Sequence, residues 1–122
     1  MANEVSITLK TVLANGNLND RWDNGTISLT QTTKGLHAAV ESVGTSEEDM
    51  SYGVLSTPGL IMMRNLDATN YITYGPKSGG SMVLMGKLAP GQQALFYLGA
   101  SVQLRWIANT AACLVSYKVY EA

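Results

Sequence analysis

The side chains that could support catalysis or metal binding are few in this sequence of 122 residues. His37 is the one histidine, and no Gly-x-Ser-x-Gly elbow or other nucleophile motif accompanies it. A mononuclear metal site on β-strands needs several clustered imidazoles, which one histidine does not supply. We therefore interpret His37 as an ordinary surface or edge residue, and we expect no catalytic residue, no metal site and no cofactor.

The nine carboxylates are the other groups with chemical potential. A glycoside hydrolase needs two carboxylates that face each other across a cleft, and a calcium site needs several oxygen ligands. Asp20 with Asp23, or the run Glu47-Glu48-Asp49, are candidates for calcium, but neither has the spacing of a known calcium loop. We interpret both as solvated acidic turns, and a small hydrolase or isomerase is the least supported class of function.

Composition narrows the class of protein further. Apolar residues make up 46% of the chain and charged residues 14%, with a net charge of −1. The eight basic residues are scattered singly, so nothing predicts binding to nucleic acid. No apolar run approaches the length of a membrane helix, and the first residues lack a secretory pattern, so we expect synthesis in the cytoplasm and no membrane partner. The single Cys113 lies in an apolar run, which predicts a buried, inert thiol.

The elements that must position any site are strands. Apolar and polar residues alternate with period two, and turn residues interrupt the pattern about every ten residues. We expect strands over residues 4–10, 26–33, 36–40, 59–65, 71–74, 81–88, 94–98, 102–109 and 113–120. The pattern predicts an all-β, antiparallel, jelly-roll-like sandwich of about eight strands with little helix, as a single domain over residues 1–122. An immunoglobulin-like sandwich is the main alternative.

Between these strands we expect three irregular stretches. Residues 15–25 are the longest irregular segment of the first half and include Trp22 among polar residues. Residues 45–51 are expected to form one helical turn capped by Ser46. Residues 75–80 are expected to be a long flexible connection.

Particular residues predict the geometry of turns. Asn15-Gly16 and Asn24-Gly25 suit turns with positive φ, and Pro90 with Gly91 suits a type II turn. Asp67 is expected to close an Asx-turn on the backbone, and Arg64 to pair with Asp67 or to cap nearby carbonyls. We take five residues as structural turn positions: Arg64, Asp67, Asn70, Pro90 and Gly91.

Contact surfaces are predicted from the aromatic residues. Trp106 alternates with apolar neighbours and is expected in the core, whereas Trp22 and Tyr120 suit an interface, since Trp and Tyr anchor many interfaces. The residues that we expect at an interface, either between subunits or with another protein, are Arg21 and Trp22, Val5 and Ile7 of the N-terminal strand, and Tyr120.

The segment from Leu55 to Gly75 carries a recognisable pattern: a Pro-Gly turn, an apolar strand, Arg64-Asn65-Leu66-Asp67, Thr69-Asn70 and a strand that ends in Gly75. Together with residues 88–92 and 114–121, it resembles the small jelly-roll decoration (cement) proteins of tailed-bacteriophage capsids. The resemblance implies a homodimer or homotrimer that clamps neighbouring subunits of the major capsid protein, and it implies no catalytic residues.

The expected function is therefore that of a structural virion protein, located on the outer capsid surface. The alternative is a receptor- or carbohydrate-binding module of a tail fibre or baseplate, in which Trp22 and the Asn and Asp residues of 17–24 would form a sugar-stacking platform.

Overall fold

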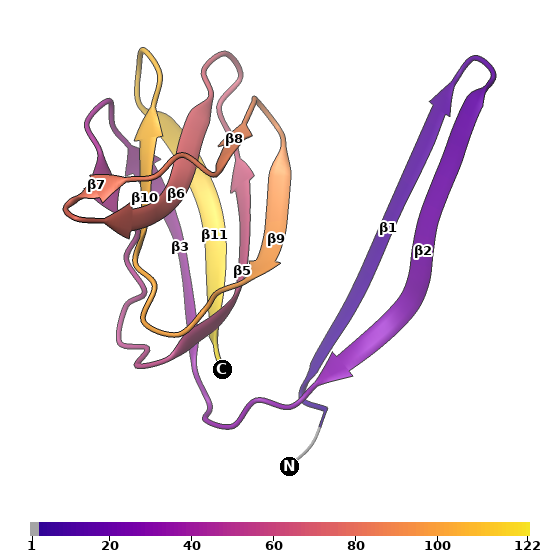
Figure 1. The fold of residues 1–122 in the computed structure, drawn as a ribbon, viewed down its shortest axis with the longest axis horizontal. Coiled ribbons are helices and arrows are strands. Elements are labelled where there is room, and N and C mark those ends of the chain that lie inside the picture. Colours follow the sequence, from indigo (N-terminus) through magenta and orange to yellow (C-terminus); the bar gives the residue numbers. More distant parts are fainter. Residues whose placement is uncertain (1–2) are drawn as a thin grey trace. The chain divides into compact units, whose positions relative to one another are not determined.

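The computed structural model describes residues 3–122, which form eleven β-strands and no helix. The expected all-β class is confirmed. The chain divides into two compact units, within residues 1–32 and 33–122. The first is a hairpin of β1 (Val5–Asn15) and β2 (Leu18–Leu29), whose strands hydrogen-bond only to each other (Figure 1). The sandwich therefore occupies residues 33–122 rather than the expected 1–122.

The sandwich consists of two antiparallel sheets, drawn as two layers in Figure 1. One sheet has the strand order β3-β11-β5-β9, and the other has the order β4-β10-β6, to which β7 and β8 add by pairing with β6. The strands are β3 (Leu36–Val43), β4 (Glu48–Asp49), β5 (Pro58–Asn65), β6 (Ile72–Ser78), β7 (Ser81–Met82), β8 (Gly86–Leu88), β9 (Gln93–Tyr97), β10 (Leu104–Ala108) and β11 (Cys113–Glu121).

The strand pairing is that of a jelly roll. With the two-residue β7 set aside, the first strand of the sandwich pairs with the eighth, the second with the seventh, the third with the sixth and the fourth with the fifth. These pairs are β3–β11, β4–β10, β5–β9 and β6–β8. Such pairing arises when one long hairpin folds over into two sheets. The jelly-roll expectation of about eight strands is thus confirmed for residues 33–122.

The core lies between the sheets, where the alternate residues of each strand meet. On β11, Cys113, Val115, Tyr117 and Val119 are buried, and the residues between them face outward. Trp106 of β10 is 1% exposed and packs edge-on against the Tyr117 ring, with 5.1 Å between ring centroids. Burial raises the pKa of the Cys113 thiol. The expectations of a core Trp106 and a buried Cys113 are confirmed.

The predicted type II turn after β8 forms as expected. Gly91 has a φ of +78°, and the Gln92 N–H donates to the Ala89 carbonyl at 3.0 Å, with Pro90 at the second position. Gly16 also has a positive φ, +58°, at the tip of the hairpin. Local turn chemistry is enough to set both corners.

The expectation of an irregular segment at residues 15–25 is wrong. Only Gly16 and Asn17 lie outside strands, because β2 begins at Leu18 and continues to Leu29, short of the predicted end at residue 33. Asn24-Gly25 is a β-bulge within β2 and not a turn. A bulge shifts the alternation of side chains by one residue, so one strand carries two phases of the pattern and looks irregular in the sequence.

The helical turn expected at residues 45–51, with its Ser46 cap, is also wrong. Glu48 and Asp49 form β4, which pairs with β10. The Arg105 guanidinium of β10 donates to Glu47 at 2.8 Å and to Asp49 at 2.7 Å. These charge-assisted contacts between distant parts of the chain outweigh a local helical preference.

The flexible connection expected at residues 75–80 is instead the end of β6 and a tight turn. Gly79 and Gly80 have φ values of +62° and +89°, as a two-residue type I′ hairpin turn requires. The strand expected over residues 81–88 is interrupted between β7 and β8. There the chain passes against Gly75, where an added Cβ would overlap the Val83 carbonyl oxygen.

Candidate interaction surface

The hairpin unit has a register that two glycines define. At its tip, Asn15 pairs with Leu18 around the two-residue loop Gly16-Asn17, and a positive φ at the first loop residue alone fits a type II′ turn. In its middle, Thr8 pairs with Thr26 but Lys10 pairs with Asp23. Leu9 therefore faces two residues of β2, Asn24 and Gly25.

The bulge decides which side chains of β2 share a face. Without it, Trp22 and Ile27, which are five positions apart, would point to opposite sides of the ribbon. The extra residue at Asn24-Gly25, with Gly25 at a φ of +75°, restores them to the same side. Trp22 then lies on the face to which Val5 and Ile7 belong.

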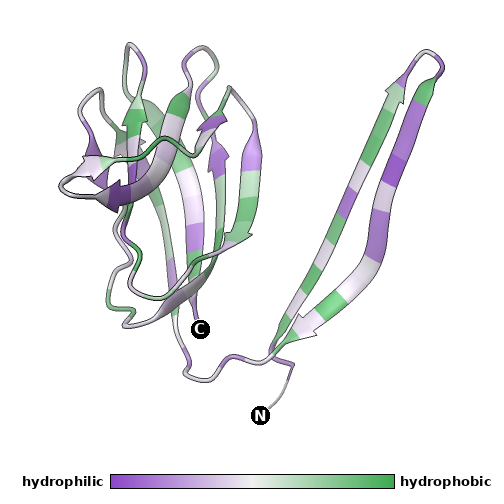
Figure 2. Ribbon diagram, viewed as in Figure 1, coloured by the Kyte–Doolittle hydropathy of each residue, from purple (hydrophilic) through white to green (hydrophobic). Residues whose placement is uncertain are grey.

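This arrangement gives the hairpin one strongly apolar face, which we call the arm face. Its residues follow from the register: Val5, Ile7, Leu9, Thr11, Leu13 and Asn15 of β1, with Leu18, Asp20, Trp22, Ile27 and Leu29 of β2. The opposite face is mostly polar, although it includes Val12 and Ala14. Figure 2 shows the apolar and polar residues alternating along β1.

The arm face is exposed over most of its length. Five of its large side chains are about half exposed: Leu9 (51%), Leu13 (45%), Leu18 (60%), Trp22 (57%) and Ile27 (46%). A large apolar side chain has a surface of roughly 150–250 Å², so these five expose roughly 500 Å². A two-stranded hairpin is marginally stable on its own, and an apolar patch of this size is typical of a binding surface.

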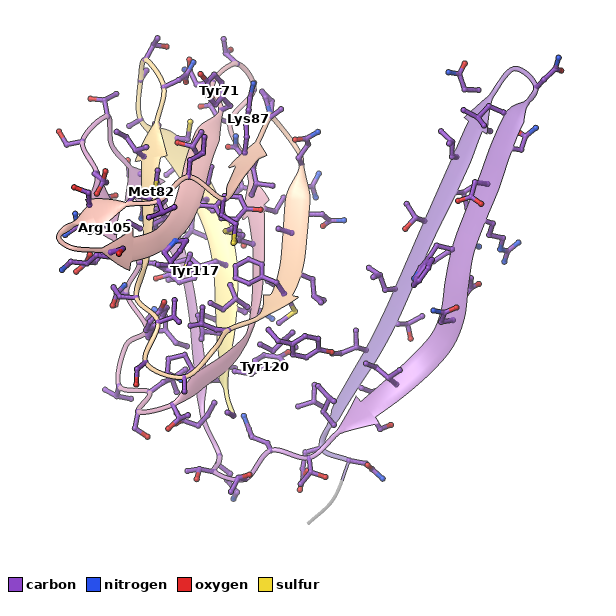
Figure 3. The ribbon with its side chains drawn as sticks, in the orientation of Figure 1. Tyr71, Met82, Lys87, Arg105, Tyr117 and Tyr120 are labelled. Atoms are coloured by element: carbon purple, nitrogen blue, oxygen red, sulfur yellow. The ribbon has the colours of Figure 1, made fainter. Side chains whose placement is uncertain are left out.

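The structure brings together three of the five predicted interface residues. Val5, Ile7 and Trp22 lie on the arm face. Arg21 lies on the opposite face, where its guanidinium contacts the Asp23 carboxylate at 3.2 Å. Tyr120 belongs to the sandwich unit, near the end of β11 (Figure 3).

Sequence reasoning missed the other apolar residues of the arm face: Leu9, Leu13, Leu18, Ile27 and Leu29. A signal for them exists. Apolar residues occupy even positions at Leu18 and Trp22 and odd positions at Ile27 and Leu29, with Asn-Gly between the two sets. A phase change across Asn-Gly is the signature of a bulge in one continuous strand.

A second apolar surface lies on the sandwich, on the outer side of the sheet β3-β11-β5-β9. We call it the outer sheet face. Its first row crosses all four strands through Leu36, Tyr120, Leu60 and Tyr97. Its second row is Ala38, Lys118, Met62 and Leu95. Leu36 and Tyr97, on the two edge strands, are 58% and 55% exposed, whereas Leu60 between them is 5% exposed. Tyr120 thus belongs to an apolar sheet face, as an interface residue would.

His37 has a structural environment. It lies on β3, the edge strand of its sheet, as expected, and its Nε2 is 3.1 Å from the Tyr117 hydroxyl. That hydroxyl donates to the Ser51 carbonyl at 2.9 Å, and burial raises the pKa of Tyr117 strongly. His37 therefore serves as a hydrogen-bond partner for the buried Tyr117 hydroxyl at the edge of the core.

The acidic candidates for calcium do not converge. Asp20 and Asp23 point to opposite faces of β2, because the alternation between them is regular. Glu47 and Asp49 bind Arg105, and this contact lowers the pKa of Glu47. Across residues 3–122, no cluster of three or more His, Cys, Asp or Glu side chains has the arrangement of a metal site.

The predicted turn residues meet around Asn65, which sequence reasoning did not select. Asn65 is fully buried, and its amide donates at 3.0 Å to the carbonyls of Asn70 and Leu88. Its backbone also pairs with Gly91. Asp67 closes the expected Asx-turn by accepting from Thr69 and Asn70, which lowers the pKa of Asp67.

Arg64 does not form the ion pair with Asp67, which was one of the two contacts predicted for it. No ion pair between Arg64 and Asp67 is present in the described part of the chain, and Arg64 is exposed on the outer sheet face. Its side chain alternates outward from β5, whereas Asp67 lies beyond the end of that strand.

A surface hollow of about 400 Å³ lies between residues 52–58 and 98–103. Tyr52 is the one ionisable side chain that lines it, and its hydroxyl donates to the Val102 carbonyl at 3.2 Å and accepts from the Leu104 N–H at 2.9 Å. Gln103 donates its amide to two backbone carbonyls. These groups are engaged by the protein itself, and the hollow contains no carboxylate or imidazole for acid–base chemistry.

Comparison with known proteins gives no match to a family model, to a curated protein or to a solved structure. Within the described residues, no helix is long and apolar enough to cross a membrane.

Proposed function

We propose that this protein is a structural virion protein that decorates the outer capsid surface of a tailed phage and clamps neighbouring major capsid subunits. The observation that carries the proposal is the exposed arm face, an apolar side of a hairpin with a Trp22 side chain 57% exposed. A surface of this kind suits a protein partner, since aromatic and aliphatic side chains dominate the centres of protein interfaces.

The chemistry of the remaining residues agrees with a binding role. His37, Glu47, Asp49 and Arg105 are engaged in contacts that hold the sandwich together. The jelly roll supplies a rigid scaffold, and the hairpin extends the binding area beyond what a sandwich of 90 residues offers by itself. Surfaces on a rigid scaffold, rather than reactive groups, are what a decoration protein requires.

The proposed mechanism is thermodynamic linkage. A protein that binds only the expanded capsid lattice adds its binding free energy to the stability of that lattice. Because a symmetric oligomer contacts several capsid subunits at once, each single contact can be weak. The shell is then held at its seams without covalent bonds.

The test uses virions produced with and without the gene for this protein. Electron microscopy is expected to show surface density that is lost with the gene, and heating is expected to release the genome at a lower temperature from the virions that lack the protein. Purified protein added back is expected to restore both. Unchanged surface density together with unchanged heat resistance would refute the proposed function.

The exposure of Trp22 also fits the alternative, a carbohydrate-binding module. The composition of the arm face argues against it, because the register gives this face three polar side chains, Thr11, Asn15 and Asp20, and a larger number of apolar ones, while a sugar platform needs several hydrogen-bonding groups beside the ring. A glycan array distinguishes the two functions. Reproducible binding that Trp22→Ala abolishes would favour the carbohydrate module.

A further inference from the structure

We infer that the arm face of one chain packs against the outer sheet face of a second copy, so that exchanged hairpins close a cyclic homo-oligomer. The proposed function requires only that this protein bind the capsid, and it leaves the occupant of the arm face open. The inference concerns that occupant and can be tested on the isolated protein.

The two faces have matching form. Each is one side of an antiparallel β-sheet, and two such sides pack face to face at a separation of about 10 Å with interdigitating side chains. The arm face presents Leu9, Leu13 and Trp22, and the outer sheet face presents Leu36 and Tyr97. The contact would add a third, two-stranded layer to the sandwich of the neighbouring copy.

The distribution of charge favours packing of the arm face on the outer sheet face over packing of two arm faces on each other. Asp20 is the only ionisable residue on the arm face. Two arm faces packed on each other would bury two carboxylates without a cation, which is strongly unfavourable. The ionisable residues that the register places on the outer sheet face are Lys118 and Arg64, and both are basic. A negative group on one face and positive groups on the other make the arm-to-sheet contact complementary.

The buried area also fits a closed assembly. One arm exposes roughly 500 Å² of apolar side chain and would cover a similar area of sheet, so that one contact buries roughly 1,000 Å². A single contact is at the lower limit of a stable interface. Two reciprocal contacts bury roughly 2,000 Å², which is within the range of specific, stable complexes.

The sequence between the two units permits exchange. Residues 30–35, Thr-Gln-Thr-Thr-Lys-Gly, form no strand and contain no large apolar side chain. Thr33 and Gly35 hydrogen-bond to Ala122 and Glu121 at the end of the chain, at 3.5 Å and 3.0 Å, so the connection between β2 and this anchor is residues 30–32. Three residues of extended chain span at most about 10 Å. A polar connection of this length lets identical hairpins pack on neighbouring copies, which is a common route to symmetric oligomers.

The first experiment measures the mass of the isolated full-length protein by light scattering, with a matched pair of variants. Leu18 on the arm face and Val12 on the opposite face are both 60% exposed. The unmodified chain is expected to have the mass of two or three copies. Leu18→Asp is expected to raise the dissociation constant about tenfold or more, while Val12→Asp leaves the mass unchanged. Circular dichroism of each variant reports whether the sandwich remains folded.

The second experiment distinguishes arm-to-sheet packing from arm-to-arm packing. Leu18→Asp damages the arm face, and Leu36→Asp damages the outer sheet face. In the inferred contact, the intact arm of the Leu36→Asp chain fits the intact sheet face of the Leu18→Asp chain. A concentrated mixture of the two variants is therefore expected to form an open heterodimer held by this one intact contact, which neither variant can form alone. Charge reversal gives an independent test: Asp20→Lys and Lys118→Asp each weaken assembly, and the double variant recovers it.

Four results would overturn the inference: a monomeric mass for the unmodified chain at about 100 µM, Leu18→Asp chains that stay fully assembled, assembly that Val12→Asp disrupts as strongly as Leu18→Asp does, or mixtures of the two damaged variants that form no heterodimer at that concentration. Binding to capsids is measured separately. A monomer that still binds capsids refutes only the inferred exchange, whereas an oligomer that binds no capsid refutes only the proposed function.

Discussion

Replacing Asn65 with alanine tests how the sandwich closes at one end. The Asn65 side chain is fully buried and makes three hydrogen bonds: it donates to the carbonyls of Leu88 and Asn70 at 3.0 Å each, and it accepts from the Asp67 N–H at 2.9 Å. In this way it joins the end of β5 to the loop before β6 and to the end of β8. Alanine at this position removes all three bonds at once.

The expected loss of stability follows from the groups left behind. A buried polar group without a partner is destabilising by about 1–3 kcal/mol. Leu88 is 4% exposed, so its carbonyl bears the full penalty, whereas Asn70 and Asp67 are half-buried and water can reach them in part. We expect Asn65→Ala to lower the free energy of unfolding by about 2–4 kcal/mol. For a domain of this size, that lowers Tm by about 10–25 °C.

Thermal and urea unfolding followed by circular dichroism measure this change. Asn109→Ala is the control, because the Asn109 side chain is exposed and accepts a single hydrogen bond from the Tyr71 N–H at 3.2 Å. This variant is expected to lower the free energy of unfolding by less than about 1 kcal/mol. Asn65→Asp is expected to be at least as destabilising as Asn65→Ala, since a carboxylate would face two carbonyls. The reasoning is refuted if Asn65→Ala stays within about 0.5 kcal/mol of the unmodified protein, or if Asn109→Ala has an equal effect.

Three further outcomes are expected from single changes. In the folded state the pKa of Asp67 is below its ordinary value of 3.8. The Asp67 carboxylate therefore stabilises the fold above pH 3.8, and this stabilisation is lost as the pH falls through the lowered pKa. Asp67→Ala should lower the urea midpoint at pH 7, and the difference from the unmodified protein should vanish in acid. Gly75→Ala should destabilise by about 1–3 kcal/mol, because its Cβ would overlap the Val83 carbonyl oxygen, while Gly44→Ala, with open space around it, is the control. Residues 33–122 expressed alone should unfold in one cooperative transition, because this unit contains both sheets and the core.

Each of these expectations has a result that contradicts it. An Asp67→Ala midpoint that differs from the unmodified protein equally at all pH values would show that the carboxylate charge is irrelevant. Equal unfolding temperatures for the two glycine variants would show that the approach to Val83 imposes no constraint. A molten or aggregated fragment of residues 33–122, without sharp unfolding, would show that the sandwich depends on the hairpin.

The candidate surface shows where sequence reasoning fails. Trp22, Val5 and Ile7 could be selected because aromatic and alternating apolar residues have recognisable patterns. The continuous arm face could not be assembled from them, because its geometry depends on one bulged residue at Gly25, and a slip of one residue exchanges the faces of a whole strand. Tyr120 was selected for its residue type, and only the register of β11 with β3 and β5 places it on an apolar sheet face.

Local chemistry determined the all-β class, the Pro90-Gly91 turn and the burial of Trp106, because period-two alternation and fixed φ values act over a few residues. The pairing of strands, β4 in place of a helical turn, and the role of Asn65 depended on partners such as Arg105 and Leu88, which are distant in the chain. Hydrogen bonds and ion pairs between remote segments form only when the whole sheet is assembled. The tertiary structure alone therefore decided that residues 5–29 form a separate hairpin with an exposed apolar face.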